Sequence, residues 1–459
     1  MQLMSMPDKA IPLQAAGLWV RKIQTTAGDW EQEAKSRRYN FLEAVGMMTF
    51  ILVLLWPVAY LFGMYGGIEA VNTGVHLLIV AGACYLLFVS PFVHRDTAES
   101  WGLGNPRALW RMLRDASPGR RAGLAAMLVI LFVALNWANY SQWHEVAAFF
   151  QFDRVAAFFG MPGADIGAYN THFPGRLVVI AFGTILSALI VSCCIRYDNF
   201  LSAFKTAMCF ALPLLALIFL GAYLQRGAAA FAHFSFRMWA VGVLGYICWG
   251  FVQQLLFSSY FGTRFRKAFA PSTDPANRVP AGRRVPYLLR FAAGAALGAA
   301  ALSYAGIRYA HGPGHVEPAI LLGIGMAGAC VGAFYGWSYC LDKKRLLVAT
   351  VCASCFGLIH IASYGLVAMT WLLGIFLVYV FMEDKNRNLI ALGFIHGLLG
   401  STFGQLFSEG AAGVLEVDYR VGPWNIREPS LVSLVFPMCC IAAYVAFMAW
   451  GARNIREEQ

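Results

Sequence analysis

The chain has 459 residues, of which 59% are hydrophobic and 13% charged, and its mean hydropathy is +0.60. Soluble domains typically carry about 25% charged residues, so this composition excludes a soluble globular protein and indicates a polytopic membrane protein. The net charge of +11 does not indicate nucleic-acid binding, because basic loops beside membrane spans account for it through their attraction to anionic lipid.

Windows of about 20 apolar residues mark candidate membrane-spanning helices. They predict an all-α transmembrane helix bundle of about twelve spans, near residues 43–64, 76–93, 122–138, 177–195, 206–224, 238–262, 286–308, 318–340, 346–362, 365–382, 388–406 and 430–451. The chain then divides into a cytoplasmic N-terminal arm (1–42), N-terminal transmembrane helices (43–230), a transmembrane core (236–406), and an outer loop with the last span (407–459).

The distribution of lysine and arginine predicts the orientation of these spans. If the N-terminus and every second loop are assigned to the cytoplasm, those segments hold 27 of the 35 basic residues and the outer segments hold 7. This bias is the positive-inside pattern, so both termini are expected on the cytoplasmic side. We expect a multi-pass protein of a cell membrane, the first span being a retained anchor without the pattern of a cleaved signal peptide.

Two segments outside the spans have helical charge patterns. The residues from Trp30 to Ala44 mix charges at helical spacing just before the first span, which predicts an interfacial helix. The residues from Arg107 to Asp115 set Trp110 and other apolar side chains among three arginines, a pattern suited to the inner leaflet. An ordinary positive-inside loop is an equally good interpretation of the second segment.

Other segments suggest how the helices are covered and packed. Two longer outer segments, 139–176 and 407–429, are rich in aromatic, glycine, proline and acidic residues and could cap the bundle on its outer face. Stripes of glycine on two neighbouring spans allow helix backbones to approach closely in lipid; they are formed by Gly294 and Gly298, and by Gly328, Gly332 and Gly336.

Two adjacent amides and two imidazoles lie inside predicted spans. The stretch from Trp249 to Phe261 is apolar and aromatic except for Gln253, Gln254 and two serines, and His360 and His396 lie on two later spans. Burying an unpaired amide costs on the order of a few kcal/mol, and ionisable groups at membrane depth usually mark function. For either histidine alone, a hydrogen bond between helices is the competing interpretation.

Depth in the membrane favours one shared site for these groups. Measured from the nearest basic residue at the cytoplasmic end of each span, Gln254 is roughly 15 Å deep, His396 roughly 13–14 Å and His360 roughly 22 Å. In a hydrocarbon core about 30 Å thick, these depths lie at or slightly beyond the midplane. We therefore expect the polar groups to converge in one buried cavity.

The same residues resemble a known family. The spacing Phe-x-x-x-His, with a second histidine 36 residues later on an apolar helix, is similar to the CPBP (CAAX protease and bacteriocin-processing, or Abi) intramembrane endopeptidases. The resemblance covers roughly residues 238–404 and is carried by Phe356–His360, His396–Gly400, Gly374–Tyr379, Asn388 with Leu389, and the stretch Gln253–Ser258, which aligns with the family motif EExxxR. Membership would place the chain in a bacterial inner membrane.

The resemblance implies a hydrolytic mechanism that this sequence alters. In the family the paired glutamates are thought to activate a water that attacks a peptide carbonyl, and here Gln253 and Gln254 replace them. A neutral amide cannot act as a general base, but it keeps the size and much of the hydrogen-bonding capacity of glutamate. Gln253 and Gln254 would then position water, while His360 and His396 would transfer protons and stabilise the oxyanion.

The sequence differs from the family motifs at two further positions, and it leaves two functional interpretations open. Ser258 stands where the family has arginine, and Gly400 stands where a polar residue commonly follows the second histidine. The leading interpretation is an endopeptidase acting on a membrane-associated peptide or protein within the lipid; the alternative is a catalytically inactive relative that binds or scaffolds membrane partners. We expect no cofactor or metal, because two histidines without a carboxylate at ligand spacing fall short of a catalytic zinc site.

Overall fold

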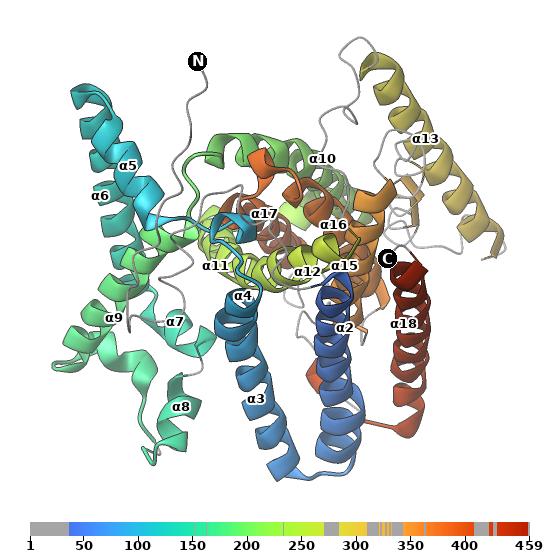
Figure 1. Cartoon of the computed structure of the whole chain (residues 1–459), viewed down its shortest axis with the longest axis horizontal. Helices are drawn as coiled ribbons and strands as arrows, with labels where there is room; N and C mark the ends of the chain where they lie inside the picture. The colour runs from blue at the N-terminus through green and yellow to red at the C-terminus, as the bar shows by residue number, and fades with distance from the viewer. Residues whose placement is uncertain are drawn as a thin grey trace. The chain divides into compact units, whose positions relative to one another are not determined.

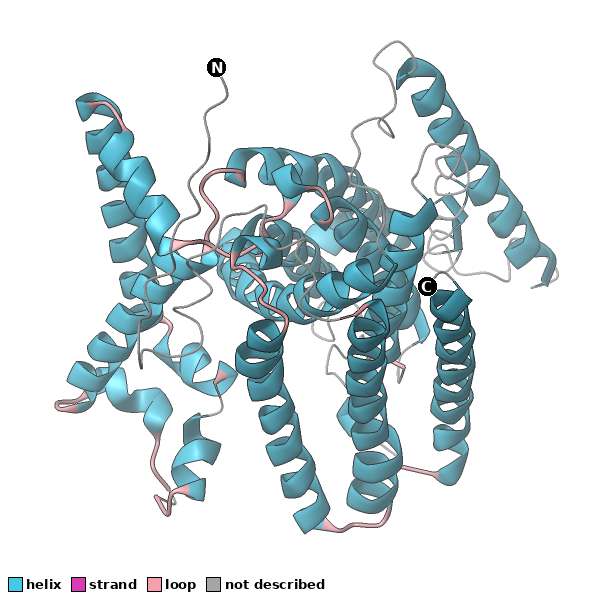
Figure 2. Ribbon diagram, in the orientation of Figure 1, coloured by secondary structure: helices cyan, strands magenta, loops and turns pink. Residues whose placement is uncertain are grey.

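The structure is a computed structural model that divides the chain into two compact units. It describes residues 36–269 except 151, 162 and 233, then 284–309, 321, 324, 325, 328, 329, 332, 343–361, 364–407, 422–425 and 429–457. The first unit combines Met1–Gly102 with Asn199–Gln459, and the second is Leu103–Asp198. Helices and their connections make up all of the described ranges, without a strand (Figures 1 and 2), which confirms the all-α prediction.

The first unit contains every residue proposed for a functional site. Its elements are α2 (Arg37–Val53), η2 (Leu54–Tyr65), α3 (Glu69–Cys84), η3 (Tyr85–Val89), α4 (Ser90–Val93), η4 (Glu99–Trp101), α10 (Phe200–Arg226), η7 (Gly227–Phe231), α11 (Phe236–Gln254), η8 (Leu255–Phe261), α12 (Gly262–Phe269), α13 (Arg284–Tyr309), α15 (Lys343–Leu358), α16 (Tyr364–Phe381), η12 (Asp384–Asn386), α17 (Leu389–Phe407), η13 (Pro423–Asn425) and α18 (Leu431–Glu457).

Local sequence explains where the first long helix begins and why it widens. The side chain of Ser36 caps α2 by accepting a hydrogen bond from the backbone N–H of Tyr39 at 3.2 Å. The helix continues without a break into η2, a π-helical segment that contains Pro57. Proline lacks an N–H and its ring clashes with the preceding turn, so the wider π spacing accommodates it within a continuous helix. The described part of the predicted interfacial helix is thus the start of this span.

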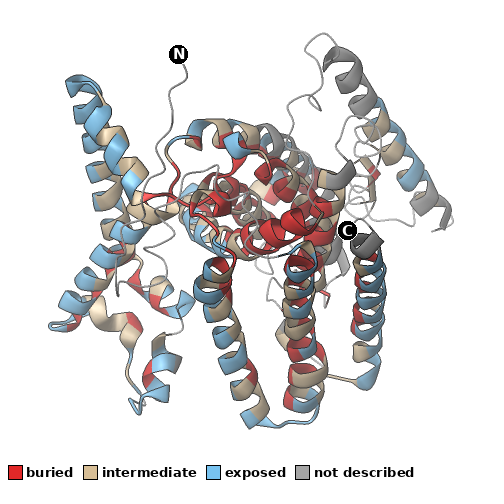
Figure 3. Ribbon diagram, in the orientation of Figure 1, coloured by how far each residue is buried: buried red, intermediate tan, exposed pale blue. Residues whose placement is uncertain are grey.

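Buried residues are concentrated where α11, α12, α15, α16 and α17 meet. Helix α11 packs along α17, α17 packs against α10, and α15 pairs with α16, while α12 packs between α2 and α15. Figure 3 shows buried positions gathered in these helices, whereas α3 and α18, which flank the α2–η2 helix, are mostly exposed or intermediate. Exposed apolar side chains on α3 and α18, such as Val80 and Val432, are what a surface facing lipid requires.

The second unit is built on two antiparallel helices with a folded segment joining them. Its elements are α5 (Pro106–Asp115), α6 (Pro118–Ser141), α7 (Trp143–Phe149), α8 (Phe152–Phe158), η5 (Ile166–Thr171), α9 (Gly175–Leu189) and η6 (Ile190–Cys194). The buried indole of Trp143 donates to the carbonyl of Ile166 at 2.6 Å, and its ring packs against Phe152 and Phe182. The segment between α6 and α9 therefore packs on the adjoining ends of these two helices, and a cap on the outer face of the bundle stays a prediction.

Seven helices in the described residues are long and apolar enough to cross a membrane: Arg37–Tyr65, Glu69–Val93, Pro118–Ser141, Gly175–Cys194, Phe236–Phe269, Leu389–Leu406 and Leu431–Arg453. Each corresponds to a predicted span. Shorter apolar helices occur at Leu214–Tyr223, Ala293–Tyr304 and Arg345–Leu358, within three further predicted spans, and most of 318–340 lies outside the described residues. The chain is thus a helical protein with several potential spans, and the count of twelve and the orientation stay predictions.

The glycine stripes make the close contact expected of them. An ideal Cβ atom added to Gly298 would lie 2.0 Å from the carbonyl oxygen of Gly328, and one added to Gly332 would lie 1.9 Å from that of Gly294. Only residues without a side chain permit such an approach of two backbones. The prediction of helix packing is confirmed for these four glycines, while Gly336 lies outside the described residues.

Candidate functional site

Gln253 and Gln254 lie at the end of α11, where a π-helical segment begins. The side chain of Ser235 caps α11 by accepting from the N–H of Met238 at 3.3 Å, and the helix continues through η8 and α12 to Phe269. Both amides are buried, with 8% and 1% of Gln253 and Gln254 exposed. Single π-helical turns inside longer helices are frequent at functional sites. The Ser258 hydroxyl, one turn further on, donates to Oε1 of Gln254.

His396 lies directly against the face of α11 that carries these amides. A Cβ atom added to Gly250 would lie 2.5 Å from Cβ of His396, so α11 and α17 are in close contact at this point. Gly250, Gln253 and Gln254 are spaced i, i+3 and i+4, which puts them on one side of the helix. Both ring nitrogens of His396 are buried, and neither they nor Nε2 of Gln254 have a hydrogen-bond partner among the described residues.

His360 reaches the same region from the end of α15. Its Nδ1 lies 2.9 Å from the carbonyl oxygen of Phe356, and a carbonyl only accepts hydrogen bonds, so the proton of a neutral ring is on Nδ1. The ring of Phe356 lies 5.4 Å from that of His360 and 5.9 Å from that of His396, between ring centroids. Phe257 of η8 packs on the same phenylalanine at 4.8 Å. Phe356 therefore joins η8, α15 and α17.

These contacts bring the predicted residues into one neighbourhood. His360 and His396 share Phe356, and the face of α11 beside His396 carries both glutamines. We call Gln253, Gln254, His360 and His396 the amide–imidazole site. Within the described ranges, no three His, Cys, Asp or Glu side chains gather as metal ligands would, and the expectation about cofactors stays a prediction.

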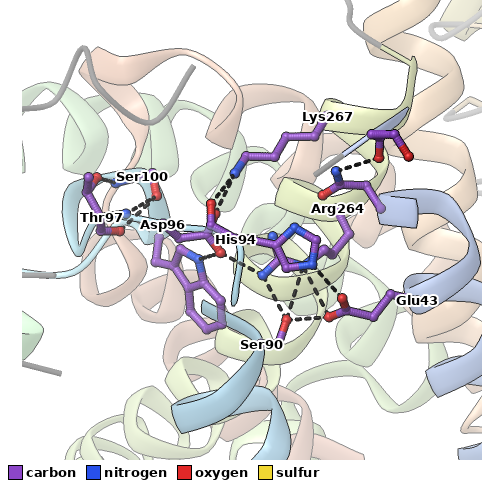
Figure 4. A network of polar contacts seen from close by, with 11 residues as sticks. Glu43, Ser90, His94, Asp96, Thr97, Ser100, Arg264 and Lys267 are labelled. Carbon is purple, nitrogen blue, oxygen red and sulfur yellow. Dashed lines mark hydrogen bonds and ion pairs between the residues drawn. The ribbon is translucent and has the colours of Figure 1, made fainter. Parts of the chain in front are cut away.

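A second polar cluster, which the sequence reasoning missed, lies further along the same long helix. Figure 4 shows Arg264 of α12 between Glu43 of α2 and Asp96 of the loop after α4. Arg264 Nη2 contacts Asp96 Oδ2 at 2.6 Å and Ser90 Oγ at 2.8 Å, and Nε lies 3.4 Å from Glu43 Oε1. We call this cluster the charge network; it also includes Lys267, His94, Trp101 and Tyr260.

The remaining contacts of the charge network satisfy the two carboxylates. Lys267 Nζ lies 2.7 Å from Asp96 Oδ1, and the Trp101 indole donates to Asp96 Oδ2 at 3.1 Å. His94 Nε2 lies 2.5 Å from Glu43 Oε2, and the Tyr260 hydroxyl donates to Glu43 Oε1 at 3.2 Å. The side chains of the four charged residues are 0% to 7% exposed. Two buried anions thus meet two buried cations, as the cost of burying an unpaired charge demands.

The segment 263–285 was predicted to be a cytoplasmic loop between two spans, and its described residues 263–269 form the helix α12. Helix α12 extends to Phe269, and Arg264, Arg266 and Lys267 are 0%, 5% and 5% exposed. Those cations are held inside the helix bundle and do not face solvent as a loop would. A usable signal was present, because the predicted orientation puts Glu43, Asp96 and Arg264 near span ends on one side of the membrane, where opposite charges can pair.

Acidification is expected to weaken the fold through His94, which faces Glu43, Asp96 and Arg264 in the charge network. Burial lowers the pKa of His94 below its ordinary value of 6.5, although the hydrogen bond with Glu43 opposes this. The unfolded chain therefore takes up this proton at a higher pH, and stability falls as pH drops through about 6.5. Thermal unfolding in detergent at about pH 7.5 and 5.5 should show a smaller fall for His94→Gln than for the unmodified chain; equal falls would contradict the assignment.

Comparisons with families of known proteins, with curated proteins and with solved structures found no match to this chain. The fold and the two clusters therefore define a class and no more: an all-helical protein with several potential membrane spans, a buried amide–imidazole site and a buried charge network on the same long helix.

Proposed function

We propose that this chain is an intramembrane endopeptidase of the CPBP type, or a close derivative, that hydrolyses a peptide bond in a membrane-associated substrate. The observation that carries the proposal is the set of unpaired polar atoms where α11 meets α17. Among the residues that the structure describes, the two ring nitrogens of His396 have no partner, and Nε2 of Gln254 on the facing helix is also unpaired. Unpaired buried groups are costly, and a site that must accept a water and a peptide group explains why they are kept.

The residues of the amide–imidazole site support distinct roles in hydrolysis. Ser258 holds Oε1 of Gln254, so the amide N–H groups are left to donate to the oxygen of an attacking water. A ring nitrogen of His396 accepts the proton of that water as its oxygen bonds to the peptide carbonyl carbon. The resulting imidazolium then protonates the leaving amine as the carbon–nitrogen bond breaks. His360 donates its Nδ1–H to the Phe356 carbonyl, so its Nε2 stabilises the oxyanion only in the protonated, imidazolium form of the ring.

Replacing His396 by alanine is expected to abolish cleavage, because it removes the proton acceptor. The assay uses the full-length protein in lipid with a set of membrane-spanning peptides, and mass spectrometry detects new termini. His144→Ala is the control, since His144 lies on α7 of the second unit, whereas the four site residues lie in the first unit. Cleavage that survives His396→Ala with the fold intact would refute the proposed role of His396.

A second candidate function is favoured by the two glutamines. An amide has no proton-accepting group near neutral pH, so Gln253 and Gln254 also fit an inactive relative whose site binds a peptide or lipid without cutting it. Gln254→Glu separates the two functions: cleavage that appears only in this variant marks the unmodified chain as a binding protein. If the unmodified chain cleaves and Gln254→Glu leaves the rate unchanged or lowers it, the binding interpretation fails.

A further inference from the structure

Helix α5 presents two chemically different faces. Asn105 caps the helix by accepting from the N–H of Arg107 at 3.0 Å and of Ala108 at 3.4 Å, and Pro106 occupies the first turn. Helical spacing puts Leu109, Trp110 and Leu113 along one stripe and Arg107, Arg111 and Arg114 along another. The helix is thus amphipathic, and its polar stripe carries three arginines with Asp115 beside them.

The unit to which α5 belongs covers its apolar stripe only in part, since Leu109 and Leu113 are half-buried and Trp110 is exposed. Not one residue of α5 is buried, and Trp110 is 66% exposed. Arg114 pairs with the neighbouring Asp115 at 2.8 Å, whereas Arg107, Arg111 and Arg120 form no hydrogen bond or salt bridge with the described residues. Between residues 106 and 121 the chain carries five arginines and one acidic residue, so the segment has a large excess of positive charge at its surface.

The position of α5 is fixed at the ends of two potential spans. Arg121, in the first turn of α6, donates to the carbonyl oxygens of Arg114 at 2.6 Å and Ala116 at 3.2 Å, which ties the end of α5 to the start of α6. Helix α5 also packs against η6, where the second potential span of this unit ends. Gly104 approaches the same place, since a Cβ atom there would lie 2.4 Å from the carbonyl oxygen of Ile195. The two potential spans of this unit therefore have neighbouring ends beside α5.

We propose that α5 is a binding surface for anionic phospholipid headgroups, with Arg107 and Arg111 on the phosphates and Trp110 at the boundary of the acyl chains. The positive charge of the surface favours an anionic ligand. An apolar stripe beside arginines at the end of a span matches a leaflet in which anionic headgroups lie next to apolar acyl chains. Guanidinium groups bind phosphate through two parallel N–H donors, which makes arginine well suited to this role. This inference is independent of the proposed peptidase activity.

Native mass spectrometry of the delipidated full-length protein in detergent tests this surface. Phosphatidylglycerol should bind more tightly than phosphatidylcholine, and Arg107→Gln/Arg111→Gln should lower the affinity for phosphatidylglycerol by roughly 10-fold or more. Arg107→Lys/Arg111→Lys retains the charge and should recover most of the lost affinity. The matched control is Arg176→Gln/Arg237→Gln, which removes two exposed arginines elsewhere and should leave the affinity unchanged.

Two results would overturn the proposal. One is equal binding of the two lipids, and the other is an equal loss of phosphatidylglycerol affinity in the control pair, which would show that only overall charge matters. Circular dichroism of each variant verifies that the helical content is unchanged, so a loss of lipid affinity is not a loss of fold.

Discussion

Arg264→Met is expected to lower the free energy of unfolding by about 3–5 kcal/mol, because it leaves Glu43 and Asp96 buried without their shared cation. Methionine replaces the stem of the arginine side chain but not its guanidinium group, so the loss reports the missing cation more than the packing of the stem. Arg264 is fully buried and contacts both carboxylates, and it joins α2, the loop after α4, and α12. Unfolding can be followed in mixed micelles by the loss of helical signal with increasing denaturing detergent.

An exposed pair elsewhere in the chain provides the control for this variant. Arg114 and Asp115 form an ion pair at 2.8 Å with side chains that are 63% and 61% exposed, and exposed pairs contribute little to stability. Arg114→Met should therefore leave the unfolding midpoint unchanged. A midpoint for Arg264→Met equal to that of the unmodified chain would mean that the charge network contributes nothing to the fold.

Gly250→Ala is expected to disturb the amide–imidazole site by forcing α11 away from α17. The new methyl group would lie 2.5 Å from Cβ and 2.8 Å from Cγ of His396, and 3.1 Å from the carbonyl oxygen of Gly393. Overpacking of this kind typically costs about 1–3 kcal/mol, in spite of the better helix propensity of alanine. Any function that depends on His396 should be lost together with this stability, measured as peptide cleavage or peptide binding beside the unfolding midpoint.

The same helix supplies the control for the glycine variant. Gly245 has no atom within 4 Å of an added Cβ, so Gly245→Ala should be neutral or slightly stabilising because it reduces the conformational freedom of the unfolded chain. Equal behaviour of the two variants would contradict the view that close approach of α11 and α17 positions His396.

The helical class and several spans follow from local sequence. Apolar stretches such as 43–64, 122–138 and 430–451 recur as the long apolar helices Arg37–Tyr65, Pro118–Ser141 and Leu431–Arg453. A segment in lipid must satisfy its backbone hydrogen bonds internally, and a helix does this with residues close in sequence. Helix ends were predicted less well. Arg264 was interpreted as the solvent-exposed end of a span, whereas it is buried and pairs with carboxylates distant in sequence.

The candidate site was recognised because its residues are individually unusual for a membrane helix. His360 and His396 are imidazoles in apolar stretches, and Gln253 and Gln254 are adjacent amides. The free-energy cost of burying these groups could therefore be inferred without a structure. The charge network was not recognised, since Glu43, Asp96 and Arg264 each lie near a predicted span end, where a solvated charge is ordinary. Only their proximity in space makes them a cluster.

The sequence by itself determined that the chain is helical and apolar enough for membranes, and that four polar side chains in it require partners. Those properties depend on composition and on neighbours along one helix. Tertiary structure alone decided that Phe356 contacts both imidazoles, that Gly250 faces His396, and that Arg264 pairs with Glu43 and Asp96. All but one of these contacts join residues on different elements, and such contacts depend on how helices pack, which is set by the shape of whole surfaces rather than by any local pattern.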